Sequence, residues 1–156
     1  MNRCPWPGKS ELMIAYHDEE WGVPVHDDRL LFEYMILDAF QAGLSWSTVL
    51  NKRKNFKKAF DNFEPEKIAK YGKKKYESLL LDAGIIRNRA KIKAAIINAQ
   101  KFLEIQKEFR SFDKYIWQFV GGITKVNKFK KLSQIPAKSK ESDVMSKDLI
   151  KRGFKF

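Results

Sequence analysis

The chain has 156 residues, of which 44% are hydrophobic, and this is enough for one compact domain and too much for a disordered segment. It contains no run of 18 apolar residues and no apolar stretch near its first residues, so the sequence predicts neither a membrane-spanning helix nor a secretory signal. A single cysteine excludes an internal disulfide and suits a reducing compartment, for which we expect the cytoplasm.

The formal net charge of +12 is unevenly distributed along the chain. Residues 1–50 carry a net charge of −5, whereas residues 51–156 carry +17. A basic region of this size favours a polyanionic partner such as a nucleic acid. The alternative is a lysine-rich composition in which lysine is simply the default surface residue.

The spacing of apolar residues predicts helices nearly throughout, because these residues recur at intervals of three and four. A helix capped by Asp27 or Asp28 is expected to stop at Gly43, and Ser45 is expected to cap the following helix. Further helices are expected over residues 65–71, 73–82, 89–109, 112–120 and 142–152. Residues 22–25 are expected to form a loop, and residues 123–140 an irregular basic stretch. The expected fold class is all-α, in a single compact domain.

Two stretches combine aromatic rings with polar groups and a glycine: Ala15-Tyr-His-Asp-Glu-Glu-Trp-Gly22 and Gln41-Ala-Gly-Leu-Ser-Trp46. A core segment would not place a histidine and three acids between two aromatic residues, so these stretches are typical of a pocket for a flat ring. A nucleotide that has been flipped out of a duplex is held between aromatic faces in this way. The candidates for stacking are Trp6, Tyr16, Trp21 and Trp46. The alternative is that these rings fill the core.

Asp38 lies late in the helix that is expected to end at Gly43, next to apolar Leu37. Its carboxylate could accept hydrogen bonds from the edge of a base or stabilise a nearby cation. The alternative is a solvent-facing position on the outer side of the helix.

Residues 79–92 have the pattern of a helix-hairpin-helix: a helix, a tight turn at Gly84, two isoleucines and a new helix. Gly84 is expected to permit the backbone conformation of the turn, while Ile85 and Ile86 bury it against the core. Free N–H groups at the start of the second helix would then face outward, where they can bind a phosphate. The expected sources of positive charge at this place are Arg87, Arg89 and Lys91. An ordinary helical hairpin explains the same pattern without DNA.

Cys4 and His17 are of the residue types that bind zinc. Two ligands do not make a structural zinc site, and His26 is the one other histidine in the sequence. From the residues alone, a buried cysteine without a ligand is the better interpretation.

Taken together, five segments resemble the DNA-3-methyladenine glycosylase I family, the constitutive 3-methyladenine glycosylases. They occur in the family's order and span the chain from end to end. The segments are Arg3-Cys4-x-Trp6, Ala15-Tyr-His-Asp-x-Glu-Trp-Gly-Val-Pro24, Gln41-Ala-Gly-Leu-Ser-Trp46, Asp82-Ala-Gly-Ile-Ile-Arg87 and Ser146-Lys-x-Leu-x-Lys-Arg-Gly-Phe-Lys-Phe156.

The resemblance implies a bacterial base-excision repair enzyme of the helix-hairpin-helix superfamily. Such an enzyme flips 3-methyladenine out of alkylated double-stranded DNA, hydrolyses its N-glycosidic bond, and leaves an abasic site and a free methylated purine. The family is monofunctional and needs no redox cofactor, and we expect a monomer without membrane contact. The alternatives are a non-catalytic DNA-binding protein, a relative that acts on another lesion, and a basic helical protein that binds RNA.

The resemblance also implies roles for single residues. Tyr16 and Asp38 would be catalytic and would hydrogen-bond the base, Trp6 and Trp46 would stack on it, and Trp21 would line the pocket. Gly43 and Leu44 would fill the gap left in the duplex. The backbone of the DNA would be held at the hairpin by Gly84, Ile85, Ile86, Arg87, Arg89 and Lys91.

This chain departs from the family pattern in two places. Position 38 is commonly glutamate in the family, so Asp38 keeps the acid with one methylene less. The second departure concerns the end of the chain: residues 1–156 would form the family's domain without its last thirty or so residues. Cys4 and His17 would be two ligands of a structural zinc, whose other two ligands the family carries in that last segment.

Overall fold

A computed structural model describes residues 4–156, so Arg3 of the first matching segment lies outside the described residues. The described part is built from helices and contains no strand, which confirms the all-α fold class. The α-helices are α1 (Glu11–Glu19), α2 (Asp28–Gln41), α3 (Trp46–Ala59), α4 (Pro65–Ile68), α5 (Lys73–Leu81), α6 (Arg89–Phe109), α7 (Phe112–Trp117) and α8 (Lys140–Lys151). Short 3-10 turns are η1 (Asp61–Phe63), η2 (Gln118–Val120) and η3 (Leu132–Gln134). None of the helices described is long and apolar enough to cross a bilayer.

Side-chain caps fix where most of these helices begin. Six of the described helices are preceded by an N-cap residue whose side chain accepts a hydrogen bond from a backbone N–H of the first turn. These residues are Ser10, Asp27, Ser45, Asn88, Ser111 and Ser139. Each such cap typically contributes about 1 kcal/mol. Asp28 does not cap its own helix but accepts the backbone N–H groups of Phe112 and Asp113 at 2.8 and 2.7 Å. It therefore fastens the start of α2 to the start of α7.

The structure differs from the expected elements at three places. Helix α1 was not expected, because the stretch around Tyr16 is polar. In the structure this helix buries one hydrophobic residue, Met13. Helix α8 begins two residues earlier than expected, since Ser139 and Ser142 cap each other's backbone there. Helix α4 ends at Ile68, short of the expected residue 71.

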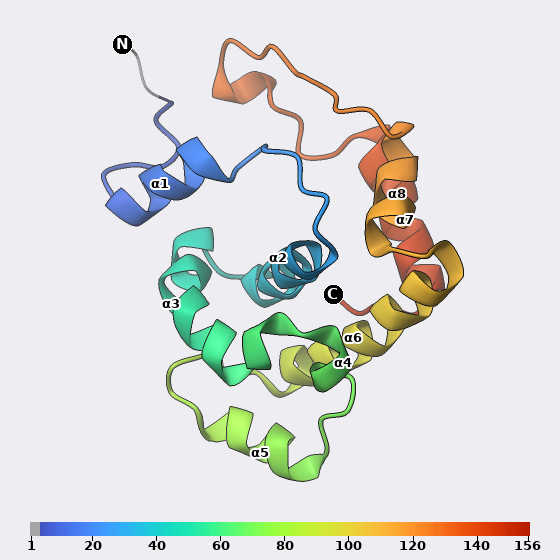
Figure 1. Cartoon of the computed structure of the whole chain (residues 1–156). Coiled ribbons are helices and arrows are strands. Elements are labelled where there is room, and N and C mark those ends of the chain that lie inside the picture. The colour runs from blue at the N-terminus through green and yellow to red at the C-terminus, as the bar shows by residue number, and fades with distance from the viewer. Residues whose placement is uncertain (1–3) are drawn as a thin grey trace.

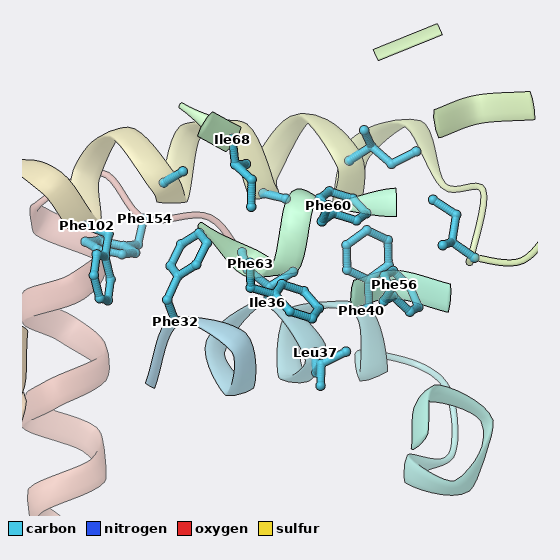
Figure 2. Close-up of a cluster of buried hydrophobic side chains, with 14 of the residues drawn as sticks. Phe32, Ile36, Leu37, Phe40, Phe56, Phe60, Phe63, Ile68, Phe102 and Phe154 are labelled. Carbon is cyan, nitrogen blue, oxygen red and sulfur yellow. The ribbon is translucent and has the colours of Figure 1, made fainter. Parts of the chain in front are cut away.

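Helix α2 is the central element, with α3, α6 and α7 packed around it (Figure 1). The side chains on its inner face are completely buried, and they are Phe32, Ile36, Leu37 and Phe40. Figure 2 shows the ring of Phe40 among aromatic rings of the following segments, with its centroid 4.7 Å from that of Phe56. Burial of one such side chain contributes about 1.5–3 kcal/mol. This packing fixes α2, and with it Asp38, against the rest of the molecule.

Candidate functional site

A cavity of about 480 Å³ lies between α1, α2 and α7. Helix α1 contributes Tyr16 to its wall, the residue that follows α1 contributes Glu20, and α2 contributes Tyr34 and Asp38. The remaining wall comes from residues 22–25, from α7 and from the chain just after it. Apolar walls with a few convergent polar groups are typical of a small-molecule site. Tyr16 and Asp38, to which the family resemblance assigns contacts with the same base, line one cavity although they come from different helices.

Asp38 keeps both carboxylate oxygens available to a ligand. Among residues 4–156 no side chain or backbone group forms a hydrogen bond or ion pair with this carboxylate. The residue is open to solvent through the mouth of the cavity, yet the surrounding protein is dense enough that desolvation raises the pKa of the carboxyl to about 6. A second cavity, of about 630 Å³ between α2, α7 and α8, also reaches Asp38. An unpaired carboxylate at such a place suits a cationic or hydrogen-donating ligand.

Tyr16 lies beside Asp38 and holds its proton firmly. Burial raises the pKa of its hydroxyl to about 12, and the negative charges of Asp38 and Glu20 act in the same direction. At neutral pH the phenol is therefore a hydrogen-bond donor. Its ring centroid lies 5.1 Å from that of Trp46, the first residue of α3. The Nε1 atom of Trp46 is buried and lacks a hydrogen-bond partner in the described part of the chain, which is uncommon in a folded protein.

The other predicted aromatic residues form a separate exposed stack next to Tyr16. The rings of Trp6 and Trp21 are 5.3 Å apart, and Trp21 stacks in turn on His17 at 5.5 Å. Trp6 and Trp21 are 40% and 46% exposed, respectively. Trp6 also lies 6.4 Å from Tyr16. The structure therefore brings the four predicted rings together, with Tyr16 as the one that reaches the cavity of Asp38, and the stacking roles stay predictions.

A charge network that the sequence did not predict adjoins the cavity. Arg53 donates through Nη1 to both oxygens of Glu20, at 2.9 and 2.7 Å, and through Nε to Glu33 at 2.7 Å. The hydroxyl of Tyr34 also donates to Glu20. The sequence does contain a signal, because Glu33 lies at helical spacing from the apolar Ile36. In the structure Glu33 is 3% exposed. An acid on the apolar side of a helix needs a buried partner.

The network decides which acid in the cavity remains uncompensated. Burial would raise the pKa of Glu20, but the hydrogen bonds from Tyr34 and Arg53 outweigh it and leave the pKa below its ordinary value. Glu20 is therefore ionised and neutralised by Arg53. Asp38 is ionised near neutral pH and has no such partner, so the negative charge that faces a ligand is that of Asp38.

The expectation that Lys91 offers positive charge to DNA is wrong. Lys91 is 6% exposed, and its ammonium group donates to the carbonyl oxygens of Phe40 at 2.8 Å and Ala42 at 2.5 Å. These carbonyls end α2 and have no partner within the helix, so a cation is favourable there. Lys91 therefore ties the start of α6 to the end of α2 and is unavailable to a phosphate.

We expect Lys91→Met to lower the free energy of unfolding by about 1.5–3 kcal/mol, because two hydrogen bonds from a charged donor are lost. Urea unfolding followed by circular dichroism measures this change. The control is Lys93→Met, two residues further on the same helix and exposed, for which we expect a change within about 0.5 kcal/mol. Equal stability of the two variants would contradict the role of Lys91 as a tie.

The predicted hairpin is present between α5 and α6, with one corrected detail. Gly84 does not have a positive φ. A Cβ at this position would lie 2.9 Å from Oδ1 of Asp82, which accepts the N–H of Gly84 at 2.7 Å, so a larger residue would displace that side chain. Ile85 is buried at 3% exposure and Ile86 is half-buried, as expected. Exposed positive charge at the turn comes from Arg87 and Arg89.

The loop between α2 and α3 presents an apolar side chain to solvent. Leu44 is 40% exposed, and Gly43 before it has a φ of +77°, a conformation that favours glycine. The loop is held by the backbone N–H of Leu44, which donates to the carbonyl of Gln41 at 2.7 Å. Since Lys91 binds the carbonyl of Ala42, this loop is also anchored to the start of α6.

Cys4 and His17 line one cavity, of about 780 Å³, which also includes Trp21. The Nδ1 atom of His17 pairs with Asp18 at 2.9 Å, which leaves Nε2 for a metal. Residues 4–156 contain no group of three or more histidine, cysteine, aspartate or glutamate side chains placed to hold a metal ion. A structural zinc site has four protein ligands, so a role for Cys4 and His17 as zinc ligands stays a prediction.

Comparison with known proteins gives the same picture over the whole chain. The methyladenine glycosylase family model matches residues 6–156. The chain is 47% identical over 156 residues to DNA-3-methyladenine glycosylase 1 of Escherichia coli (strain K12), with 100% of this chain and 83% of that protein covered.

Solved structures extend the comparison to the fold. A crystal structure of 3-methyladenine DNA glycosylase I (TAG) matches with a TM-score of 0.95 at 45% identity, over 99% of this chain and 85% of that one. A Staphylococcus aureus structure that addresses 3-methyladenine recognition by the same enzyme matches with a TM-score of 0.95 at 35% identity, over 99% and 82%. The chain belongs to the methyladenine glycosylase family.

Proposed function

We propose that this protein is a DNA glycosylase that removes 3-methyladenine from alkylated double-stranded DNA and leaves an abasic site. The names of its relatives support this substrate and reaction. The observation that carries the proposal is the unpaired carboxylate of Asp38, which shares a cavity with the proton-donating hydroxyl of Tyr16. A flat, positively charged base that can accept and donate hydrogen bonds suits this pair.

The chemistry asks little of the protein beyond binding and electrostatics. A methylated adenine in DNA carries a positive charge, so its bond to the sugar is weakened before the enzyme acts. Water adds to the sugar carbon, the base leaves with the bonding electrons as a neutral molecule, and one proton is released. Asp38 can stabilise the positive charge that builds up on the sugar, or orient the attacking water. Tyr16 can hydrogen-bond the edge of the base.

The rest of the proposed DNA contact follows from the two exposed turns. Leu44 would enter the space that the flipped base leaves. The hairpin would bind the backbone with Arg87 and Arg89 and with the N–H groups at the start of α6, because the N–H groups of Gly84 and Ile85 already donate to Asp82. Extrusion of a base costs on the order of a few kcal/mol and least for a damaged base, which favours the lesion. The non-catalytic alternative predicts the same contacts without base release.

Three finer statements belong to the same proposal. The protein would act as a monomer. It would act in the cytoplasm, which is supported by its single cysteine and by the bacterial origin of its relatives. Cys4 and His17 are proposed as two ligands of a structural zinc. This zinc would be structural and would take no part in the proposed reaction.

The experiment is the release of free base from methylated duplex DNA, resolved by chromatography into 3-methyladenine, 7-methylguanine and 3-methylguanine. We expect selective release of 3-methyladenine. Tyr16→Ala and Trp46→Ala should abolish release and leave binding to undamaged duplex nearly intact, because neither residue lies on the hairpin. Duplex binding without release by the unaltered protein would favour the non-catalytic alternative, and release of another base would favour another lesion. Equal loss of release and duplex binding in both variants would make the two residues structural.

A further inference from the structure

The segment from the end of η2 to the first residue of α8 is a long, exposed basic part of the molecule that the proposed DNA contact does not yet include. Residues 121–140, here called the basic segment, contain six lysines and neither aspartate nor glutamate. All twenty residues are exposed. The lysines are Lys125, Lys128, Lys130, Lys131, Lys138 and Lys140.

The charge of the basic segment is largely uncompensated. Lys125 pairs with Glu141 in the first turn of α8. Within residues 4–156 none of the other five lysines forms an ion pair. Apolar side chains also stay in solvent here, since Ile123 and Val126 are 72% and 79% exposed. An exposed basic stretch of this kind is attracted electrostatically to a polyanionic partner, whereas it has little packing on its own protein to stabilise it.

The position of the basic segment connects it to the candidate site. Thr124 and Lys125 line the same cavity as Tyr16 and Asp38, so the segment starts at the wall of that cavity. In Figure 1 the segment passes on the side of α1, whereas α5 and the hairpin turn lie on the far side of α2. A nucleotide whose base occupied the cavity would have its flanking phosphates at the rim, where the basic segment begins.

We propose that the basic segment is a second contact for the DNA backbone, on the side of the cavity opposite to the hairpin. The inference rests on the proposed function, because it takes the flipped nucleotide as the reference point. The duplex would be held at two places, one on each side of the extruded base. Lysines suit this task as point charges that release counterions from the phosphates and read no sequence.

The test is the salt dependence of binding to undamaged duplex DNA, which requires no catalysis. For the triple variant Lys128→Gln, Lys130→Gln and Lys131→Gln we expect the slope of log affinity against log salt to fall by about 0.9 for each phosphate that is no longer neutralised. If each of the three lysines neutralises one phosphate, the decrease in affinity between 50 and 200 mM salt should be about 40-fold smaller for the triple variant than for the unaltered protein.

Matched variants separate a contact from a general effect of net charge. Three exposed lysines on α6, α7 and α8 serve as the control: Lys107→Gln, Lys114→Gln and Lys151→Gln. We expect the unaltered slope for this triple, and a slope lowered by about one for Arg87→Gln at the hairpin. Unchanged salt dependence in the basic-segment triple, or an equal fall in the control triple, would overturn the inference.

Base release keeps this inference distinguishable from the proposed function. If the unaltered protein releases no base while the basic-segment triple lowers the salt slope, the second contact stands and the glycosylase proposal fails. If the protein releases base and the triple leaves the slope unchanged, the glycosylase proposal stands and the second contact fails.

Discussion

Asp38→Asn should lower the rate of base release by about 10²-fold or more and leave duplex binding nearly unchanged. The reason is that Asp38 supplies the uncompensated negative charge of the cavity, whereas the charge of Glu20 is held by Arg53. The rate is measured as single-turnover release of 3-methyladenine with protein in excess over DNA. A rate within about threefold of the unaltered protein would show that the carboxylate is not used.

The pH dependence gives this prediction a second signature. Because burial raises the pKa of Asp38 to about 6, base release should fall as the pH is lowered through that value and the carboxyl becomes protonated. Asp38→Asn should lack this step in its residual activity. Asp38→Glu keeps an acid and should keep the step, with a rate that reports the effect of the extra methylene. Asp143→Asn, an exposed acid on α8, serves as the control and should behave as the unaltered protein.

Stability provides a check on the same variant. A carboxyl whose pKa is raised on folding opposes folding above that pKa, since its charged form is less favourable in the folded state. The contribution is favourable toward low pH and is lost as the pH rises through about 6. Asp38→Asn should therefore be at least as stable as the unaltered protein at pH 7. A large loss of stability would mean that its loss of activity reflects misfolding.

Arg53→Met should lower the free energy of unfolding by about 3–5 kcal/mol, because it leaves a buried carboxylate without its partner. That carboxylate is Glu33, which is 3% exposed and retains a single longer contact, with Lys57 at 3.4 Å. Glu20 would lose both of its hydrogen bonds from the guanidinium. Chemical unfolding of the variant at neutral pH measures the change.

Two further variants test whether the pair itself is the cause. The double variant Arg53→Met with Glu33→Gln should be more stable than Arg53→Met alone, by more than about 1 kcal/mol, because no charge is left buried. Lys54→Met, next to Arg53 and exposed, should change stability by less than about 0.5 kcal/mol. If Arg53→Met and Lys54→Met were equally stable, the network would not support the fold.

Acid should affect the two proteins differently. The pKa of Glu20 is lowered by its hydrogen bonds from Tyr34 and Arg53, which outweigh the effect of burial. Such a group stabilises the fold above its ordinary pKa, and this contribution disappears as the pH falls through the lower pKa of the folded state. Arg53→Met should therefore lose less stability on acidification than the unaltered protein.

The elements that sequence analysis predicted are those whose signals are local. The expected caps Asp27 and Ser45 are local signals of this kind, and α2 and α3 begin directly after them. Tyr16 and Asp38 could be paired in one cavity before the structure because the family resemblance joined them, not because their spacing did. Their proximity depends on how α1 packs in the fold, where it contacts α3, and α1 has almost no apolar pattern of its own.

The elements that were missed depend on partners far away in the sequence. Lys91 has the same local context as the exposed Arg89, and its burial follows only from the carbonyl of Ala42 lying opposite. Arg53 stands in a run of basic residues that looks like an ordinary solvated helix face. Its role comes from Glu20 and Glu33, which belong to two other segments. Gly84 was correctly singled out for the wrong reason, since the limit is space and not φ.

The tie formed by Lys91 has a consequence for how lesions would be found. It joins the loop that carries Leu44 to the helix that begins behind the hairpin, so neither can shift without breaking hydrogen bonds from a buried ammonium group. In the proposed complex these two DNA contacts would therefore keep their relative positions, and the duplex would bend instead. Discrimination then begins before any chemistry, because a weakly stacked, damaged base yields to a rigid probe sooner than an intact one. A search of this kind would be passive, because the protein would capture the bases that leave the DNA duplex most easily and would not need to open the duplex itself.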